Sequence, residues 1–138
     1  MEIRACVTAD REDVVSLWEA CGLTRPWNDP RADFDQAVAT LTSTVLGAFD
    51  ENRVIASLMV GFDGHRGWVY YLAVSSDQQR QGIGRRMISA AEAWLRPHGA
   101  TKVQLMVRED NATALAFYER LGLKKQAVVT LGRRLDGR

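Results

Sequence analysis

The stretch of sequence richest in chemistry covers residues 79–86 and reads Gln-Arg-Gln-Gly-Ile-Gly-Arg-Arg. It follows an apolar run at residues 70–74, and no acidic residue separates its three arginines. Glycines at a helix start let the main chain approach an anion closely, and the unpaired N–H groups there carry partial positive charge. The pattern predicts a site for a pyrophosphate. The alternative is a helix start at which the glycines only ease the turn.

Spacing excludes two common phosphate sites. A P-loop requires a Lys directly after its last glycine, but Arg85 follows Gly84. A dinucleotide-binding fold requires a third glycine where Met87 stands and an acidic residue at the end of the next strand, which here leads into Arg108. The predicted ligand is therefore neither a Walker-type nucleotide nor NAD.

Hydrophobic periodicity indicates the elements that must position this stretch. Expected helices start at the caps Asp10, Asp29 (with Pro30 at the first helical position) and Asn111, and a long helix from Ile83 stops before Pro97. The expected strands cover residues 2–7, 45–49, 54–62, 68–74, 102–107 and 126–131. An alternative extends the last strand to residue 135. This order, β-α-α-β-β-β-α-β-α-β, predicts an α/β fold with a mixed sheet.

Two motifs resemble those of the GNAT superfamily of N-acetyltransferases. Gln79-x-x-Gly82-x-Gly84 after a Leu-Ala-Val strand is similar to its acetyl-CoA signature. Residues 107–123 look like its second motif, Asn-x-x-Ala-x-x-Phe-Tyr-x-x-x-Gly-Phe, with Leu123 in place of the final Phe. The loop at residues 25–30 and the turn at 62–67 further resemble a bacterial subgroup. The resemblance covers nearly the whole chain.

The resemblance implies a single domain over residues 1–138 with a mixed, mostly antiparallel central sheet flanked by helices. In that fold the parallel strands at 68–74 and 102–107 splay apart. The implied activity is an acetyl-CoA-dependent N-acetyltransferase, an acyltransferase of the EC 2.3.1 type. It would use acetyl-CoA as co-substrate and no metal, and transfer the acetyl group by direct attack of a primary amine in a ternary complex.

The resemblance also assigns roles to residues. Those implied to bind the cofactor are Leu72, Ala73, Val74, Gln79, Arg80, Gln81, Gly82, Ile83, Gly84, Arg85, Asn111 and Phe117. Backbone groups of Leu72 and Val74 would pair with the pantetheine amides, a backbone N–H near Leu72 would stabilise the oxyanion, and Arg80 or Arg86 would reach the outer phosphates.

Tyr118 stands at the family position of the acid that protonates the leaving thiolate. The alternative is an aromatic side chain that packs its helix against the sheet. Asn111 has two compatible roles, because one side chain can both cap a helix and contact the cofactor.

The sequence defines the acceptor side less closely. Some relatives carry a Glu on the strand equivalent to 68–74, but no carboxylate follows here before Asp77. The candidates for a general base are Asp63, His65, Asp29 and Glu109, each equally explained as a turn residue or a cap, and a water chain remains an alternative.

Four aromatic or polar residues are candidates for contact with the acceptor. Trp27 and Asn28 would edge the acceptor site, although Trp27 is equally explained as a staple for the following helix. Tyr70 and Tyr71 are expected on opposite faces of their strand, so that one lines the acceptor cleft and the other lies in the core.

Composition limits the partners. The 138 residues carry 18 Lys and Arg against 17 Asp and Glu, a net charge of +1, which argues against a nucleic-acid partner. The longest uncharged stretch, residues 36–49, is too short and polar to span a bilayer, the N-terminus lacks the apolar region of a signal peptide, and Cys6 and Cys21 form no CxxC pair. We expect a bacterial, cytoplasmic protein whose partner is an amine acceptor, either a small molecule or a protein, and a homodimer through the tail is left open.

Two rival readings predict different behaviour. A CoA-binding sensor or regulatory module would bind the cofactor with little turnover. A simple packing or interaction domain would not bind CoA.

Overall fold

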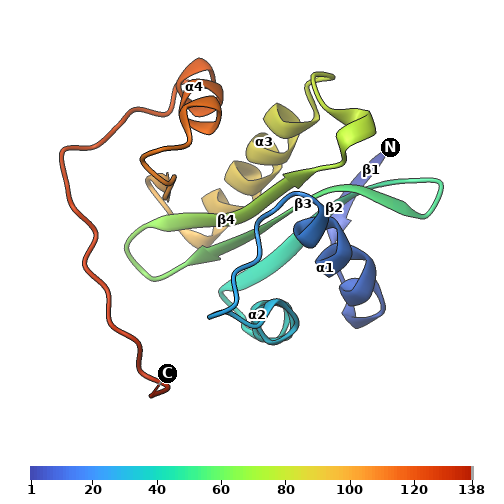
Figure 1. The fold of residues 1–138 in the computed structure, drawn as a ribbon, viewed down its shortest axis with the longest axis horizontal. Coiled ribbons are helices and arrows are strands. Elements are labelled where there is room, and N and C mark those ends of the chain that lie inside the picture. Colours follow the sequence, from blue (N-terminus) through green and yellow to red (C-terminus); the bar gives the residue numbers. More distant parts are fainter. Residues whose placement is uncertain (138) are drawn as a thin grey trace. The chain divides into compact units, whose positions relative to one another are not determined.

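A mixed sheet forms the frame of the computed structural model, which describes residues 1–137. Within these residues the sheet has five strands in sequence order: β1 (Glu2–Ala5), β2 (Ser43–Asp50), β3 (Arg53–Phe62), β4 (Gly67–Val74) and β5 (Val103–Leu105). The strands from β1 to β4 pair antiparallel, and β4 pairs with β5 in parallel. The predicted α/β fold with its mostly antiparallel sheet and one parallel pair is confirmed (Figure 1).

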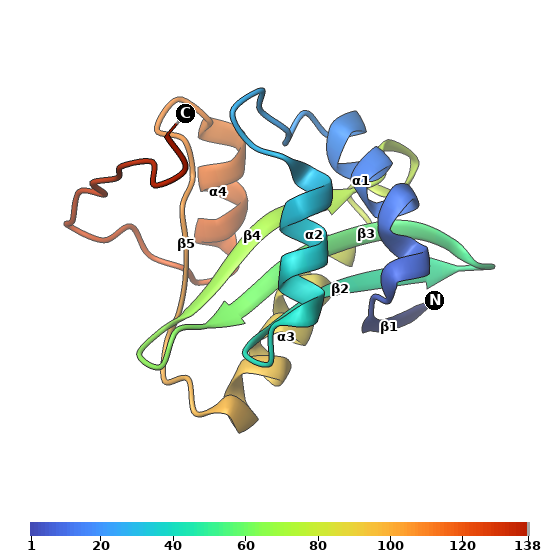
Figure 2. The ribbon, with the colours of Figure 1, turned by 90° about the horizontal axis from the view of Figure 1, so that it is seen from below.

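Helices cover both faces of this sheet. The helices α1 (Arg11–Ala20) and α2 (Pro30–Ala39) lie on one face, and α3 (Ile83–Leu95) lies on the other (Figures 1 and 2). The apolar stripe of α3 explains its place, because side chains at helical spacing turn to the sheet together. Its buried members are Ile83, Met87, Ile88, Ala91 and Leu95.

The core under α1 and α2 is built around aromatic side chains. Trp18 and Phe34 are fully buried, with ring centroids 6.3 Å apart. Trp18 also stacks on Tyr71 of β4 at 4.1 Å with an interplanar angle of 6°. Burial of one large apolar side chain contributes about 1.5–3 kcal/mol, so this cluster fastens both helices to the sheet.

Two of the predicted helix caps differ in how they act. Asp29 accepts hydrogen bonds from the N–H groups of Arg31 and Ala32 and caps α2 as predicted, with Pro30 as the first helical residue. Asp10 precedes α1, but its carboxylate accepts from Val7 N and from Arg4 instead of from the helix. Asp10 therefore occupies the predicted N-cap position of α1, but its side chain does not cap the helix, because the preceding turn and Arg4 occupy the same oxygens.

The chain divides into two units, Met1–Leu105 and Met106–Arg138. The second unit contains α4 (Ala112–Arg120), where the Asn111 side chain accepts from Ala114 N at 3.1 Å and caps the helix as predicted.

The predicted strand in the tail is wrong, because residues 126–131 form no regular element. The side chains of Val128, Val129 and Leu131 are exposed. A run of apolar and β-branched residues forms a strand only where a neighbouring strand supplies hydrogen bonds, and no strand pairs with the described tail.

Candidate functional site

The start of α3 presents a row of main-chain donors. Gly82 occupies the N-cap with φ at +78°, and no side chain caps the helix. The first internal hydrogen bond at this end runs from Arg86 N to Gly82 O at 3.1 Å. Among the described residues, no protein group accepts from the N–H groups of residues 79–85. These donors are available to a ligand, and the helix dipole adds positive potential.

Glycine is favoured at position 82 because of the backbone conformation there, and not because neighbouring atoms leave no room for a side chain. A Cβ at this position would meet no atom within 4 Å, but a positive φ is strained for residues with a side chain. Arg80 also has a positive φ, at +66°. Left-handed residues that alternate with ordinary ones turn successive N–H groups toward one side, as in anion-binding nests.

Three arginines beside these donors lack acidic partners. The side chains of Arg80, Arg85 and Arg86 are exposed, and none forms an ion pair within the described part of the chain. By contrast, Arg53 and Arg31 each contact a carboxylate. Because uncompensated positive charge meets the positive end of a helix, the geometry suits a multiply charged anion.

A charged cluster ties the turn before α3 to β3. Arg53 donates to both oxygens of Asp77, at 3.0 and 3.1 Å, and to Ser75 Oγ at 3.1 Å. Ser75 Oγ in turn donates to Asp77 at 2.6 Å. The Arg53 guanidinium, together with Ser75, lowers the pKa of Asp77 to about 2. The short helical turn at Ser76–Gln78 is thereby held in place.

The parallel strand pair separates early. Register between β4 and β5 ends at Val69 opposite Leu105, so within the described structure residues 70–74 have no strand neighbour on that side. This is the opening that the parallel pair was expected to leave. It adjoins the turn that leads into α3.

The Val74 carbonyl is not available to a ligand in this opening. It accepts from Gln79 Nε2 at 3.1 Å and from the Cys21 thiol at 3.4 Å. A carbonyl oxygen has two lone pairs, and both have protein donors here. The expectation that backbone groups of Leu72 and Val74 pair with pantetheine stays a prediction, but the Val74 carbonyl already has protein donors, and the Gln79 side chain closes the turn instead of extending outward.

Two predicted contact residues have no side chain to offer. Ala73 is buried under α1 and α2, and Ile83 is buried under α3. Only their main-chain groups can face a ligand. Leu72 is half-buried on β4, between Tyr71 and Ala73.

A β-bulge lies in the same part of β4. Ser57 pairs with Ala73 and Met59 with Tyr70, so both Tyr71 and Leu72 stand opposite one residue of β3. Tyr71 has φ at +58°, which is unusual for a bulky residue.

The bulge places Tyr70 and Tyr71 on one face. Met59 packs against the core under α1 and α2, as does Tyr71, and Tyr70 is the cross-strand neighbour of Met59. The prediction that Tyr70 and Tyr71 face opposite ways is therefore wrong, because the extra residue interrupts the alternation of the strand. Tyr71 packs on the core, whereas Tyr70 is 41% exposed and lies 6.5 Å from Trp68, ring to ring.

The Tyr71 hydroxyl donates to Asp33 of α2 at 2.8 Å. Burial, followed by the hydrogen bond to Asp33, raises the pKa of Tyr71 well above its usual range. Sequence reasoning did not single out Asp33, since its partner lies 38 residues away and no local motif links the two.

The geometry weakens two of the candidate bases. Asp29 is engaged in capping α2. Asp63 accepts from the N–H groups of His65 and Arg66 and from Trp68 Nε1, and these hydrogen bonds lower the pKa of its carboxyl. A base with a lowered pKa accepts protons poorly. His65 is exposed in the same turn, and Glu109 is exposed in the second unit.

The other predicted acceptor contacts lie in the loop before α2. Trp27 is 47% exposed, and Asn28 donates its N–H to the Arg25 carbonyl at 3.1 Å. In the second unit, Phe117 and Tyr118 meet edge to face at 5.0 Å, and burial raises the pKa of Tyr118 to about 12.

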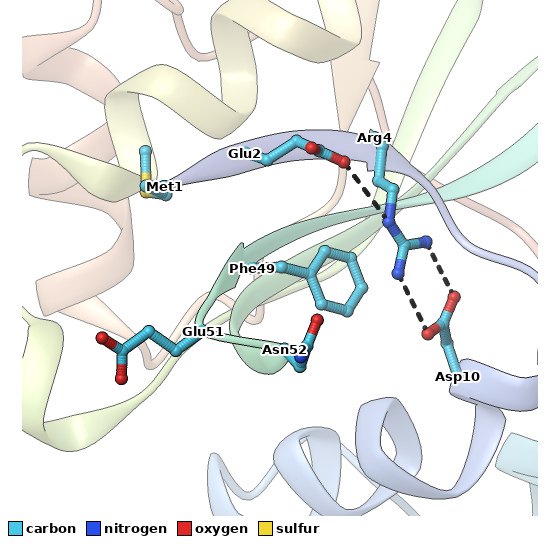
Figure 3. Close-up of a pocket in the computed structure, with 7 residues that line it drawn as sticks. All are labelled: Met1, Glu2, Arg4, Asp10, Phe49, Glu51 and Asn52. Carbon is cyan, nitrogen blue, oxygen red and sulfur yellow. Dashed lines mark hydrogen bonds and ion pairs between the residues drawn. The ribbon is translucent and has the colours of Figure 1, made fainter.

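A surface hollow lies away from this site, beside β1 and the turn between β2 and β3 (Figure 3). Its central cation, Arg4, donates to Asp10 at 2.9 Å and lies 3.9 Å above the Phe49 ring. Because this guanidinium already has a carboxylate and an aromatic partner, the hollow offers little unused chemistry.

No helix among residues 1–137 has the length and apolarity to cross a membrane. The same residues contain no cluster of three His, Cys, Asp or Glu side chains suited to a metal ion.

Comparison with known proteins identifies the family. The model of the acetyltransferase (GNAT) family matches residues 3–123. An acetyltransferase of Pectobacterium atrosepticum is 42% identical over 135 residues, which cover 98% of this chain and 96% of that protein. This chain therefore belongs to the GNAT family of acetyltransferases, and acetyl transfer is the general activity that this family supports.

Solved structures agree on the fold. The aminoglycoside antibiotic 6'-N-acetyltransferase AAC(6')-IG of Acinetobacter haemolyticus superposes with a TM-score of 0.79 at 22% identity, covering 99% of this chain and all (100%) of that one. AAC(6')-Iy, in complex with a bisubstrate analogue that contains CoA, gives a TM-score of 0.82 at 15% identity and covers 96% of this chain and 97% of that one.

Proposed function

We propose that this chain is an N-acetyltransferase that moves the acetyl group of acetyl-CoA to a primary amine by direct attack in a ternary complex. The observation that carries the proposal is the start of α3. Its main-chain N–H groups have no protein acceptor in the described chain, and the arginines beside them have no acidic partner there. A diphosphate matches both features.

The residues fit CoA in two places. The N–H groups of Gln81, Gly82, Gly84 and Arg85 would hold the pyrophosphate, and Arg80 and Arg86 the outer phosphates. The main chain of β4 beyond Val69 would pair with the pantetheine amides, as an added strand does. Each charged hydrogen bond contributes about 1.5–3 kcal/mol, so a few such bonds support micromolar affinity once binding entropy is offset.

The chemistry follows from the same placement. The amine nitrogen attacks the acetyl carbonyl, a C–N bond forms, and the C–S bond breaks. A main-chain N–H near Leu72 would stabilise the oxyanion, a type of donor that typically contributes about 2.7–4 kcal/mol. Tyr118 would protonate the departing thiolate, the role of its position in the second motif, and the proton of the amine would leave to water. Asn111 and Phe117 belong to the same motif and would contact the cofactor.

The remaining parts of the proposal concern the acceptor and the setting. Trp27, Asn28 and Tyr70 would line the acceptor site, and Tyr71, whose ring packs on the core, would border it through its hydroxyl. A small-molecule amine is supported by the aminoglycoside acetyltransferases among the structural neighbours. We propose one acetyltransferase domain over residues 1–138 that acts in the bacterial cytoplasm, without a nucleic-acid or membrane partner.

A second candidate is a CoA-binding sensor with little turnover. The observation that favours it is the engagement of Asp29 and Asp63 in a cap and a turn, which leaves neither carboxylate well suited to act as the base.

Calorimetric titration with CoA tests the α3 site, using Gly82→Asp and the matched control Gly82→Ala. Both substitutions strain a left-handed position by about 1–2 kcal/mol, but only Asp adds negative charge where the pyrophosphate would bind. We expect the wild type to bind CoA, Gly82→Ala to bind more weakly, and Gly82→Asp not to bind. If Gly82→Asp bound CoA as Gly82→Ala does, the site would have to lie elsewhere.

A further inference from the structure

A pocket of about 270 Å³ lies between α2 and the sheet. Helix α2 supplies one wall and the side chain of Met59 on β3 another. The lining residues are Asp33, Gln36, Ala37, Thr40, Ser43 and Met59. All of them belong to the first unit, and α2 lies on the face of the sheet opposite α3 (Figure 2).

Asp33 is the charged group of this pocket, and it lacks a cationic partner within the described residues. Asp10, Asp35 and Asp77 each lie within 3.0 Å of an arginine nitrogen. Asp33, although half-buried, accepts from the neutral Tyr71 hydroxyl. A carboxylate has about four acceptor positions, and a half-buried negative charge favours a cation beside it.

Partly exposed aromatic side chains lie across from Met59 on the same face of the sheet. Tyr70 is the cross-strand neighbour of Met59, shares its face and is 41% exposed, and Trp68 lies beside it. Aromatic faces attract ammonium groups and also pack against methylene chains. These aromatic side chains do not line the pocket itself, which combines the negative charge of Asp33 with the apolar side chains of Ala37 and Met59.

Tyr71 connects the pocket to the opening in β4. Its hydroxyl holds Asp33, and the next residue, Leu72, lies where β4 has lost its β5 neighbour. The carboxylate is thus one hydrogen-bonded side chain away from the segment proposed to hold the thioester.

We propose that Asp33 binds a second, protonated amino group of the acceptor, so that the preferred acceptors are diamines or polyamines. This inference rests on the proposed function. The reacting nitrogen must be neutral to attack, and a carboxylate beside it would hold it in the charged form. The ammonium group at Asp33 is therefore a different one from the nitrogen that is acetylated.

The test compares α,ω-diaminoalkanes of increasing length with n-alkylamines of matched length, by kcat/KM and by calorimetric binding in the presence of CoA. We expect the best diamine to exceed its matched monoamine by about 10- to 100-fold, the range of one charge-assisted hydrogen bond. Asp33→Asn should abolish this preference, and Tyr71→Phe should reduce it, because the carboxylate loses its orienting donor.

Asp35→Asn is the matched control, since Asp35 lies on the same helix but pairs with Arg11 outside the pocket. It should keep the preference for diamines. Affinity for CoA, measured for every variant, verifies that the fold is intact.

The outcomes separate the two proposals. Equal use of diamines and monoamines by the wild type, or an unchanged preference in Asp33→Asn, would overturn the Asp33 site. Diamine binding that depends on Asp33 in a protein without turnover would support the site and count against the transferase.

Discussion

Tyr71 holds a backbone conformation that few bulky residues adopt. A residue in the left-handed region costs on the order of 1–3 kcal/mol unless its surroundings enforce it. Here the ring stacks on Trp18 and the hydroxyl binds Asp33, so α1 and α2 both hold the bulge in β4. Backbone strain of this kind tends to occur at sites that bind or react.

Replacement of Tyr118 by Phe separates an enzyme from a sensor. Loss of a general acid typically costs about 100-fold or more in rate, whereas the ring and its packing remain. We expect kcat for acetyl transfer to fall accordingly and the affinity for acetyl-CoA to stay near the wild-type value. Steady-state kinetics and calorimetry measure the two quantities.

The pH profile supplies a second readout for Tyr118. Because burial raises its pKa to about 12, above the usual 10.0, the hydroxyl keeps its proton throughout the range in which most enzymes are assayed. Loss of activity attributable to this residue should begin only as the pH approaches 12. Full turnover in Tyr118→Phe would instead assign the residue to packing.

At the level of elements, the cluster of Arg53, Ser75 and Asp77 holds the turn that leads into α3. The Asp77 pKa of about 2 lies below its ordinary 3.8, so the folded state favours the charged form. The contribution of the ion pair to stability is complete above the ordinary pKa and is lost as the pH falls through about 2. Near neutral pH the cluster is intact.

Asp77→Asn should therefore weaken CoA binding a few-fold at neutral pH without changing kcat, because the turn loses its link to β3 while the α3 donors remain. Calorimetric titration of CoA measures the loss. Asp35→Asn also breaks a surface ion pair, but one far along the chain from this turn, and it serves as the control. Equal losses in both variants would show a general effect of surface charge.

Elements with local signals were predictable from sequence. The cap and proline at Asp29 and Pro30 fix the start of α2, and the apolar stripe from Ile83 fixes the extent of α3. The tail was not, because residues 126–131 are rich in β-branched side chains, as strands are, but lack a partner strand in the described chain.

In the candidate site, too, some features could be predicted from local sequence and others could not. The types and spacing of the glycines and arginines in residues 79–86 are enough to predict a site for an anion. The bulge at Tyr71, the bond from Tyr71 to Asp33 and the engagement of the Val74 carbonyl depend on contacts between distant segments. Such contacts follow from tertiary packing, which single-sequence patterns do not encode.

At the level of the whole molecule, Trp18 is the residue on which stability depends most directly. It is 0% exposed, stacks on Tyr71 and packs with Phe34. Removal of a buried Trp side chain typically costs about 3–5 kcal/mol, a large part of the roughly 5–15 kcal/mol by which domains are stable. We expect Trp18→Ala to lower the free energy of unfolding by that amount in urea titrations.

Trp18→Phe is the matched variant. The Trp18 Nε1 atom has no hydrogen-bond partner among the described residues, so Phe removes volume without breaking a hydrogen bond. Its cost should be clearly smaller than that of Ala. An equal cost would show that the packing of the aromatic ring against Phe34 and Tyr71 does not carry the stability assigned to Trp18.

The Cys21 thiol, which donates a hydrogen bond to the Val74 carbonyl, is a native site for chemical labelling. Burial raises the pKa of both thiols, that of Cys6 to about 12, but Cys6 is buried whereas Cys21 is only half-buried. An alkylating fluorophore will therefore modify Cys21 first, at the junction between the end of α1 and the end of β4. Emission from that label would follow ligand entry directly, without an engineered cysteine and without any turnover.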